Sequence, residues 1–209
     1  MPLQRQSRRR LLAAVPTDLQ LLQMVRRGDP AGAEALFERH AGVILHFAGR
    51  MMGSSHEAEE ICQEVFLKMI ARAHQYDGRA PLVSWLLSIA ANGCRDQLRR
   101  RKRVGPLPLS AAENIATSAP SPVSALLDEE RRVAVTRALA ELSDEQREAL
   151  VLARYHGLPY GEVAAALGIT EGAVKTRICR AVETLRRLLS DEESAVTNKE
   201  DRSWTAAKS

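Results

Sequence analysis

Residues 159–178 read Pro-Tyr-Gly-Glu-Val-Ala-Ala-Ala-Leu-Gly-Ile-Thr-Glu-Gly-Ala-Val-Lys-Thr-Arg-Ile. Gly168 marks a tight turn in the middle of this stretch, because glycine takes positive φ without steric cost. The small Ala164 falls where two helices would cross closely, and Val174 falls where the second helix would pack back on the first. We therefore predict a helix-turn-helix, whose apolar seam at helical spacing is completed by Val163, Leu167, Ile169 and Ile178.

The second helix of this motif has the features of a DNA-recognition helix. Thr170 can cap its N-terminus, and Glu171 suits the positive end of the helix dipole. Basic side chains on such a helix supply the phosphate contacts that dominate affinity for DNA. The outer face carries them at Lys175, Arg177, Arg180, Arg186 and Arg187. We therefore predict DNA binding rather than a purely structural hairpin.

The composition predicts an all-α protein of two small helical domains joined by a flexible linker. The chain has 209 residues, of which 45% are hydrophobic and only 4% aromatic, which favours aliphatic helix packing over a β-sandwich. Good helix formers dominate, and no alternating strand pattern is present. The net charge of +4 is mild for a nucleic-acid binder, so the distribution of charge matters more than its total.

Cysteine and histidine usage indicates a cytoplasmic protein without a metal or cofactor. Cys62, Cys94 and Cys179 lie far apart and form no C-x-x-C pair, so we expect no disulfide framework and interpret them as small apolar fillers. They are separate from the five histidines, which argues against a zinc site. The apolar residues after the basic start, and the uncharged stretch 81–94, are too short for a bilayer span. We expect no membrane insertion.

Shifts in composition divide the chain into five parts. Residues 1–17 form a basic arm that we expect to be disordered, and residues 18–103 contain four predicted helices. Four prolines and many small residues make 104–122 a linker. Residues 123–189 hold the second helical domain, which ends with the helix-turn-helix. Residues 190–209 are polar without periodicity, so we expect a disordered tail.

Helical periodicity also predicts which apolar side chains form the core of the first domain. These are Leu19, Leu22 and Val25; Ala33, Leu36, Phe37, Ile44, Phe47 and Ala48; Ala58, Ile61, Cys62, Val65, Met69 and Ile70; and Trp85, Leu86, Ile89, Ala90 and Leu98.

Two further stretches lie in the first domain. Residues 58–68 form an acidic amphipathic helix, and residues 85–103 form a helix that becomes strongly basic. In this order, and followed by a linker and a helix-turn-helix, they closely resemble the extracytoplasmic-function (ECF) subgroup of bacterial sigma-70-type sigma factors. The resemblance covers about residues 18–189. It implies region 2, which binds core RNA polymerase and opens the promoter at the −10 element, followed by region 4, which reads the −35 element.

The resemblance implies that residues 58–68 bind the clamp of the polymerase beta-prime subunit. The side chains that would meet a basic coiled coil through complementary charge are Glu59, Glu60, Gln63 and Glu64. The alternative is an ordinary solvated helix face.

The resemblance also implies that residues 85–103 read and melt the −10 element. Asn92 matches the position that contacts a base edge, and residues 76–82, which begin with Tyr76, match the loop that forms a pocket for a flipped-out base. Trp85 would stack on an exposed base, or belong to the core instead. The expected phosphate contacts are Arg95, Arg99 and Arg100, whereas Arg101, Lys102 and Arg103 are either further contacts or a solubilising run.

In region 4 the resemblance assigns the −35 contacts residue by residue. The positions that face the major groove are Lys175, Thr176, Cys179 and Arg180. Arg180 is able to pair bidentately with guanine, and Arg177 matches a backbone contact. Cys179 departs from the bulkier residue often found there, which leaves the preference at its base step open.

Two alternatives belong to other classes of protein. A helix-turn-helix regulator that does not bind core polymerase would need a sensing domain, but the first domain carries its own basic helix. An enzyme would need a phosphate loop, a metal cluster or a nucleophile constellation. Glu59 and Glu60 point about 100° apart on a helix and make a poor catalytic pair. We therefore expect no enzymatic activity, and the resemblance implies control by an anti-sigma factor.

Overall fold

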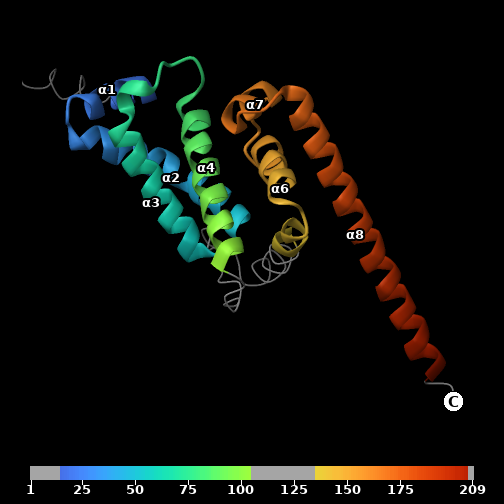
Figure 1. Ribbon diagram of the computed structural model, residues 1–209. Coiled ribbons are helices and arrows are strands. Elements are labelled where there is room, and N and C mark those ends of the chain that lie inside the picture. The colour runs from blue at the N-terminus through green and yellow to red at the C-terminus, as the bar shows by residue number, and fades with distance from the viewer. Residues whose placement is uncertain (1–14, 105–134, 207–209) are drawn as a thin grey trace, which may run out of the picture.

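A computed structural model of the chain describes residues 15–104 and 135–206, with side chains as far as residues 103 and 188 (Figure 1). Every regular element in these ranges is helical, which confirms the all-α prediction. Residues 1–14 of the expected arm, 105–122 of the linker and 123–134 of the second domain lie outside the described residues. The first domain contains α1 (Asp18–Arg26), α2 (Pro30–Met52), α3 (Ser55–Ala71), the short 3₁₀ helix η2 (Ala73–Gln75) and α4 (Leu82–Val104).

Local caps fix where the helices of the first domain begin. The Thr17 hydroxyl accepts a hydrogen bond from the Gln20 backbone N–H, and the Gln20 side chain accepts one from the Thr17 N–H, so a capping box starts α1. Asp29 caps α2 by accepting from the Ala31 N–H at 3.0 Å. The left-handed Gly53, with φ of 68°, ends α2. These signals are local, so the few residues beside each helix end determine where the helix begins or ends.

The core of the first domain differs from the prediction at its edges. Leu19, Phe37 and Ile70 were expected to face inward, but they are 49%, 46% and 47% exposed. α1 buries Leu21 beside Leu22 instead of Leu19. A periodic pattern identifies the apolar side of a helix, but it does not tell which positions a neighbouring helix covers.

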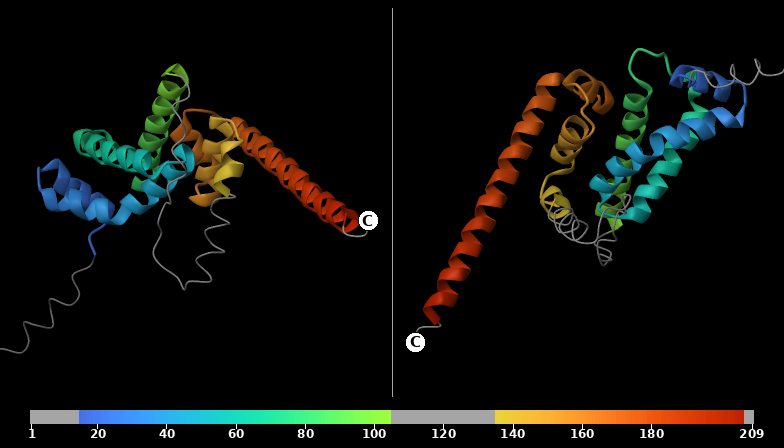
Figure 2. Two further views of the ribbon diagram at one scale, coloured as in Figure 1. Left: turned by 90° about the horizontal axis from the view of Figure 1, so that it is seen from below. Right: turned by 180° about the vertical axis from the view of Figure 1, so that it is seen from behind.

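The second domain contains a helical segment at 135–140, α6 (Asp144–Leu150), the single π-turn η3 (Val151–Tyr155), α7 (Tyr160–Leu167) and α8 (Glu171–Ala206). Ser143 and Gln146 form a capping box that starts α6. α8 extends away from the rest of the molecule (Figure 2). It continues through residues 190–206, where a disordered tail was expected. Extending an existing helix avoids the cost of nucleation, so a polar segment without periodicity follows the helix that precedes it.

The two domains pack against each other along α4, which lies between α3 and α7 (Figure 1). Their buried side chains form one continuous apolar core. The His156 ring lies edge-on to the buried Phe47 ring at a centroid distance of 5.9 Å. Burial, together with repulsion from Arg50 and His46, lowers the pKa of His156 to about 4, so the ring is neutral at pH 7 and suits this contact.

Among the helices that the structure describes, none combines the length and the apolar character that a bilayer span requires.

The crossing of α1 and α2 provides a test of this packing. A Cβ atom at Gly32 would lie 2.6 Å from the Leu21 carbonyl oxygen and 2.7 Å from the Met24 Cβ, whereas a Cβ at Gly42 would have nothing within 4 Å. We expect Gly32→Ala to lower the free energy of unfolding by about 1–3 kcal/mol through overpacking. Gly42→Ala, on the same helix, should raise it by about 0.5–1 kcal/mol through helix propensity. Urea unfolding of both variants measures this, and equal effects would show that α1 is packed differently.

Candidate nucleic-acid interface

α7 and the start of α8 have the geometry of a helix-turn-helix. Gly168 ends α7 with φ of 67°, and the Ile169 N–H then donates to the Ala164 carbonyl at 3.0 Å. The Thr170 hydroxyl accepts from the Ala173 N–H at 3.2 Å, as expected of an N-cap. The residues of the seam that are buried are Val163, Ala164, Leu167, Val174 and Ile178. The pattern in residues 159–178 therefore gives the predicted motif.

Four of the five residues assigned to the −35 element lie on one open face at the start of α8. Lys175, Thr176, Cys179 and Arg180 are all exposed. Cys179 is therefore not an apolar filler, in contrast to the buried Cys62 and Cys94. A helix that presents two cations and two small polar groups on one face is suited to enter the major groove.

Arg177 lies apart from these four residues. Its guanidinium Nη2 is 3.0 Å from Glu145 Oε2 on α6, and its side chain is 24% exposed. In this conformation Arg177 is paired within its own domain, so a contact with the DNA backbone requires the exchange of Glu145 for phosphate.

Except for Tyr76, the residues assigned to the −10 element lie on two neighbouring faces of α4. Trp85, Asn92 and Arg99 are each seven residues apart and share one face, since seven residues make nearly two turns. Asn92, Arg99 and the adjacent Arg100 are exposed, and Trp85 is half-buried. Asp96 lies 2.9 Å from the Arg99 guanidinium. The first of these faces is therefore open along most of its length.

An aromatic pair stands at the N-terminal end of this face. The rings of Tyr76 and Trp85 are 5.4 Å apart between centroids and tilted by 45°. The Tyr76 hydroxyl donates to the Ala80 carbonyl at 2.6 Å, which closes the loop between η2 and α4. The structure thus brings together the loop and the tryptophan that the sequence singled out separately.

Arg95 lies on the second face of α4 and contacts the other domain. Its Nε donates to Glu148 Oε1 at 2.9 Å. Glu148 is only 1% exposed, and this burial raises its pKa to about 7 although Arg95 lowers it. Sequence reasoning missed Glu148. The available signal was an acidic residue directly before the apolar run Ala149-Leu150-Val151-Leu152.

α3 presents the expected acidic face. Glu59, Glu60, Gln63 and Glu64 are all exposed, and Lys68 pairs with Glu64 at 2.7 Å. The same side of the helix becomes apolar toward its C-terminus, where Leu67 and Ile70 follow Glu60 and Gln63 by seven residues each. Leu67 is 67% exposed. Leu67 is not among the residues predicted to bind a partner, and Ile70 is 47% exposed rather than buried as predicted.

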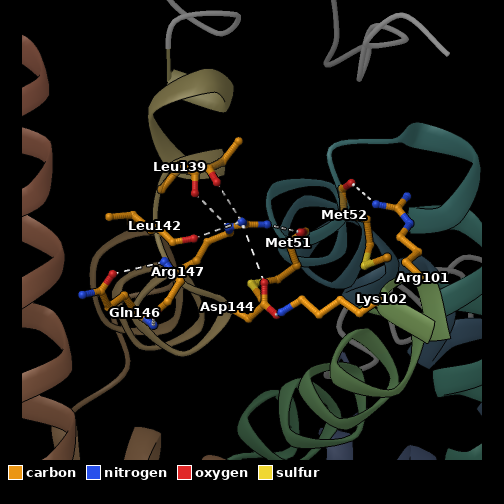
Figure 3. Close-up of polar contacts among 11 residues, drawn as sticks. Met51, Met52, Arg101, Lys102, Leu139, Leu142, Asp144, Gln146 and Arg147 are labelled. Carbon is orange, nitrogen blue, oxygen red and sulfur yellow. Dashed lines mark hydrogen bonds and ion pairs between the residues drawn. The ribbon is translucent and has the colours of Figure 1, made fainter. Parts of the chain in front are cut away.

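A group of polar contacts between the two domains lies where the C-terminus of α2 meets α6 (Figure 3). The Arg147 side chain donates from Nη1 to the Met51 carbonyl at 2.7 Å and from Nε to the Leu139 carbonyl at 2.8 Å. Arg101 donates to the Met52 carbonyl at 3.3 Å. These guanidinium groups satisfy carbonyls that the end of α2 leaves without helical partners.

Comparison with known proteins relates these surfaces to a family. The Sigma-70 region 2 family matches residues 36–104, and the Sigma-70, region 4 family matches residues 132–185. RNA polymerase sigma factor CarQ of Myxococcus xanthus is 34% identical over 178 residues, which cover 84% of this chain and 99% of CarQ. The ECF sigma factor SigL of Mycobacterium tuberculosis is 35% identical over 181 residues, which cover 80% and 97% of the two chains.

The chain belongs to the ECF subgroup of the sigma-70 family. It is an RNA polymerase sigma factor, and region 2 and region 4 correspond to the two domains that meet at α4.

Solved structures of sigma factors share the fold. CnrH in complex with the cytosolic domain of CnrY matches with a TM-score of 0.61 and 28% identity over 83% of this chain and 97% of CnrH. The sigma factor RpoE from Bartonella quintana, in complex with the anti-sigma factor NepR, matches with a TM-score of 0.61 and 26% identity over 75% and 96% of the two chains.

Cys179 gives this sigma factor a built-in probe of the region 4 face. Burial raises the pKa of Cys62 to about 11 and that of Cys94 to about 12, so neither thiol forms a thiolate at neutral pH. We expect a maleimide to label the folded chain once, at Cys179, and promoter DNA that carries the −35 element to protect it. Mass spectrometry of labelled peptides measures this. Labelling that continues unchanged on saturating DNA would remove Cys179 from the interface.

Proposed function

We propose that this sigma factor divides promoter recognition between two helices, with the start of α8 reading the −35 element and α4 reading and opening the −10 element. The observation that carries the proposal is the set of four exposed residues on α8, Lys175, Thr176, Cys179 and Arg180. Arg180 reads a guanine through a bidentate hydrogen bond, and Lys175 contributes charge beside the phosphates. Arg177 contacts the backbone after it leaves Glu145.

At the −10 element the open face of α4 distinguishes unpaired from paired DNA. The Asn92 amide contacts a base edge, and the Tyr76–Trp85 pair offers an aromatic surface on which an unstacked base is held. Flipping a base out of a duplex costs a few kcal/mol, so these contacts favour the open promoter. Arg99 and Arg100, both exposed, hold the displaced strand through its phosphates.

We further propose that the exposed side of α3 binds the clamp of the polymerase beta-prime subunit. Glu59, Glu60, Gln63 and Glu64 provide charge for a basic partner, and Leu67 adds an exposed apolar contact at the same side. The sigma factor contributes binding energy in this scheme, and the polymerase carries out the chemistry in the cytoplasm.

We also propose that an anti-sigma factor binds this chain. Support comes from the two solved relatives described above, since RpoE was solved with an anti-sigma factor and CnrH with the cytosolic domain of CnrY.

Transcription in vitro tests the proposal as a whole. Core polymerase with this protein, on a pool of genomic fragments, should produce discrete run-off transcripts that core polymerase alone does not produce. Upstream of their start sites the fragments should share two elements. A helix-turn-helix regulator that is not a sigma subunit would yield no such transcripts.

The acidic face of α3 can be tested by charge reversal. Glu60→Lys with Glu64→Lys should weaken binding to core polymerase by about tenfold or more, since like charges would then face the clamp. Exposed charges contribute little to stability, so the thermal unfolding midpoint should change little. Glu141→Lys with Glu183→Lys makes the same charge change at exposed positions of region 4 and serves as the control. Equal core affinity of the two double variants would show that the α3 face is merely solvated.

Base reading and backbone contact can be separated in region 4. Arg180→Ala should reduce discrimination at one −35 base pair by about 1–3 kcal/mol, whereas Arg177→Ala should weaken binding to all −35 variants alike and reduce the salt slope by about one. Asn92→Ala should leave −35 binding unchanged and impair opening. Fluorescence anisotropy with −35 duplexes and permanganate footprinting measure the two steps. The assignment of Arg180 is wrong if its loss affects every duplex equally.

A further inference from the structure

A guanidinium of α1 holds the backbone at the start of residues 76–82, the −10 loop. Arg26 Nε donates to the Ala73 carbonyl at 3.0 Å, and Arg26 Nη2 donates to the Tyr76 carbonyl at 2.7 Å. Both acceptors belong to the main chain and lie 47 and 50 positions further along the sequence. These two hydrogen bonds, which we call the Arg26 tether, therefore fix the backbone of residues 73–76 whatever side chains it carries.

The Arg26 tether is more than a helix cap. An arginine in the last turn of a helix commonly serves that helix alone, by facing the negative end of its dipole, and Arg26 occupies such a position in α1. Its side chain nevertheless reaches across to η2, which α1 contacts, and places two donors of one planar fork on two separate carbonyls. Hydrogen bonds from a charged donor are about twice as strong as those between neutral groups. The tether thus joins two segments of the first domain.

α1 provides a fixed base for the Arg26 tether. Leu21, Leu22 and Val25 are buried in the core of region 2. The absence of a side chain at Gly32 lets α2 approach the α1 backbone closely. Because Arg26 directly follows the buried Val25, the core of region 2 sets the position from which the guanidinium reaches out.

The −10 loop is organised by its own contacts. The Tyr76 hydroxyl donates to the Ala80 carbonyl at 2.6 Å, and the Arg79 N–H donates to Asp77 Oδ1 at 3.0 Å. Gly78 has a φ of 75°, which glycine adopts without steric cost, and this lets the chain turn between them. These contacts join residues of the loop to one another, whereas the Arg26 tether joins the loop to α1.

The Arg26 tether also sets where the Tyr76 ring stands. One of the two carbonyls that Arg26 holds belongs to Tyr76 itself, and the Tyr76 ring lies 5.4 Å from the Trp85 ring between centroids. Trp85 is near the start of α4, so a shift of the Tyr76 backbone would change the spacing of the two rings. An aromatic surface that is already arranged binds an unstacked base without the entropic cost of ordering it.

We propose that Arg26 is a positioning residue for promoter opening, because the Arg26 tether holds the Tyr76 ring beside Trp85 where the pair receives an unstacked base of the −10 element. The inference rests on the proposed role of this aromatic pair. It adds a residue of α1, outside both DNA-reading helices, on which opening depends. In this scheme Arg26 acts through the −10 loop and makes no contact with DNA.

Promoter opening by the holoenzyme measures the effect of the tether. Core polymerase is combined with the full-length sigma factor, either unchanged or as Arg26→Gln or Arg26→Lys, and permanganate footprinting follows the melted segment. Both variants should reduce opening about tenfold, because lysine keeps the charge but lacks the fork that spans two carbonyls. The control is Arg27→Gln at the exposed neighbouring position, which should leave opening within about twofold. Equal affinity of all four proteins for core polymerase shows that region 2 is folded in each.

A double-mutant cycle shows whether Arg26 acts through Tyr76. Tyr76→Leu removes the ring and should itself impair opening. Adding Arg26→Gln to Tyr76→Leu should reduce opening little further, because the effects of residues that act through one another are not additive. A direct contact of Arg26 with DNA would instead multiply the two effects.

The fluorescence of Trp85 reports the same coupling in the free chain, without DNA. The chain has two tryptophans, so Trp204→Phe leaves Trp85 as the only one. In this background Arg26→Gln should shift the emission of Trp85 to longer wavelength, toward that of Tyr76→Leu, since the half-buried indole loses the ring beside it. Arg27→Gln should leave the spectrum unchanged.

The proposal is overturned if Arg26→Lys opens the promoter as well as the unchanged protein does, because a charge alone would then suffice. It is also overturned if the effects of Arg26→Gln and Tyr76→Leu multiply, or if Trp85 emission is the same in Arg26→Gln and Arg27→Gln. Normal opening by Tyr76→Leu would contradict the proposed role of the aromatic pair, and the inference with it. Impaired opening by Tyr76→Leu beside normal opening by Arg26→Gln would overturn the inference alone.

Discussion

The structure depends on the packing of α4 against helices on two sides. α2 and α3 cover one side of it and α7 covers another, so the cores of both domains meet there. Small residues make this possible. Ala90, Ala91 and Cys94 are fully buried, and a Cβ atom at Gly93 would lie 3.2 Å from Ile61 Cδ1, so α3 approaches the α4 backbone closely. What remains of α4 is one open face, and this face carries Asn92 and Arg99. Any use of α4 on DNA is limited to that face unless region 4 moves away.

Charge is distributed according to partner rather than in total. The net charge of +4 is small, yet α3 presents four exposed acidic or amide groups and α8 presents an exposed basic face. Region 4 in turn directs carboxylates toward α4. Arg95 and Lys102 of α4 are thereby paired with carboxylates within the chain. Each surface has a charge opposite to that of its proposed partner: the clamp for α3, and phosphate for α4 and α8. This complementarity favours association with the intended partner and disfavours other partners.

The sequence was sufficient wherever structure is determined locally. Gly168, Thr170 and the apolar seam specify the helix-turn-helix because turn, cap and periodicity act within twenty residues. The exposed acidic face of α3 and the open position of Asn92 follow from helical spacing in the same way. Residue types and order were enough to identify the family, which the matches to region 2 and region 4 bear out.

Contacts between residues far apart in the sequence cannot be predicted from local patterns. Arg95 and Glu148 are 53 positions apart, and no periodicity connects two helices on either side of a linker. For the same reason the sequence could not show that Phe37 and Ile70 lie at an edge of the core, or that Arg177 pairs with Glu145. The helical continuation through residues 190–206 escaped because a polar helix has no apolar stripe to reveal it.

The central claim is that α4 and the start of α8 read separate promoter elements, although the two domains pack together in the free chain. A distance measurement between the two domains tests it most directly. Fluorescent labels at Glu34→Cys on α2 and Glu183→Cys on α8, in a Cys179→Ser background, would report the separation, because Cys62 and Cys94 are buried. The account predicts a short distance in the free chain and an increase of tens of ångströms when core polymerase and promoter DNA are added. A distance that stays unchanged in a complex that makes specific transcripts would contradict it.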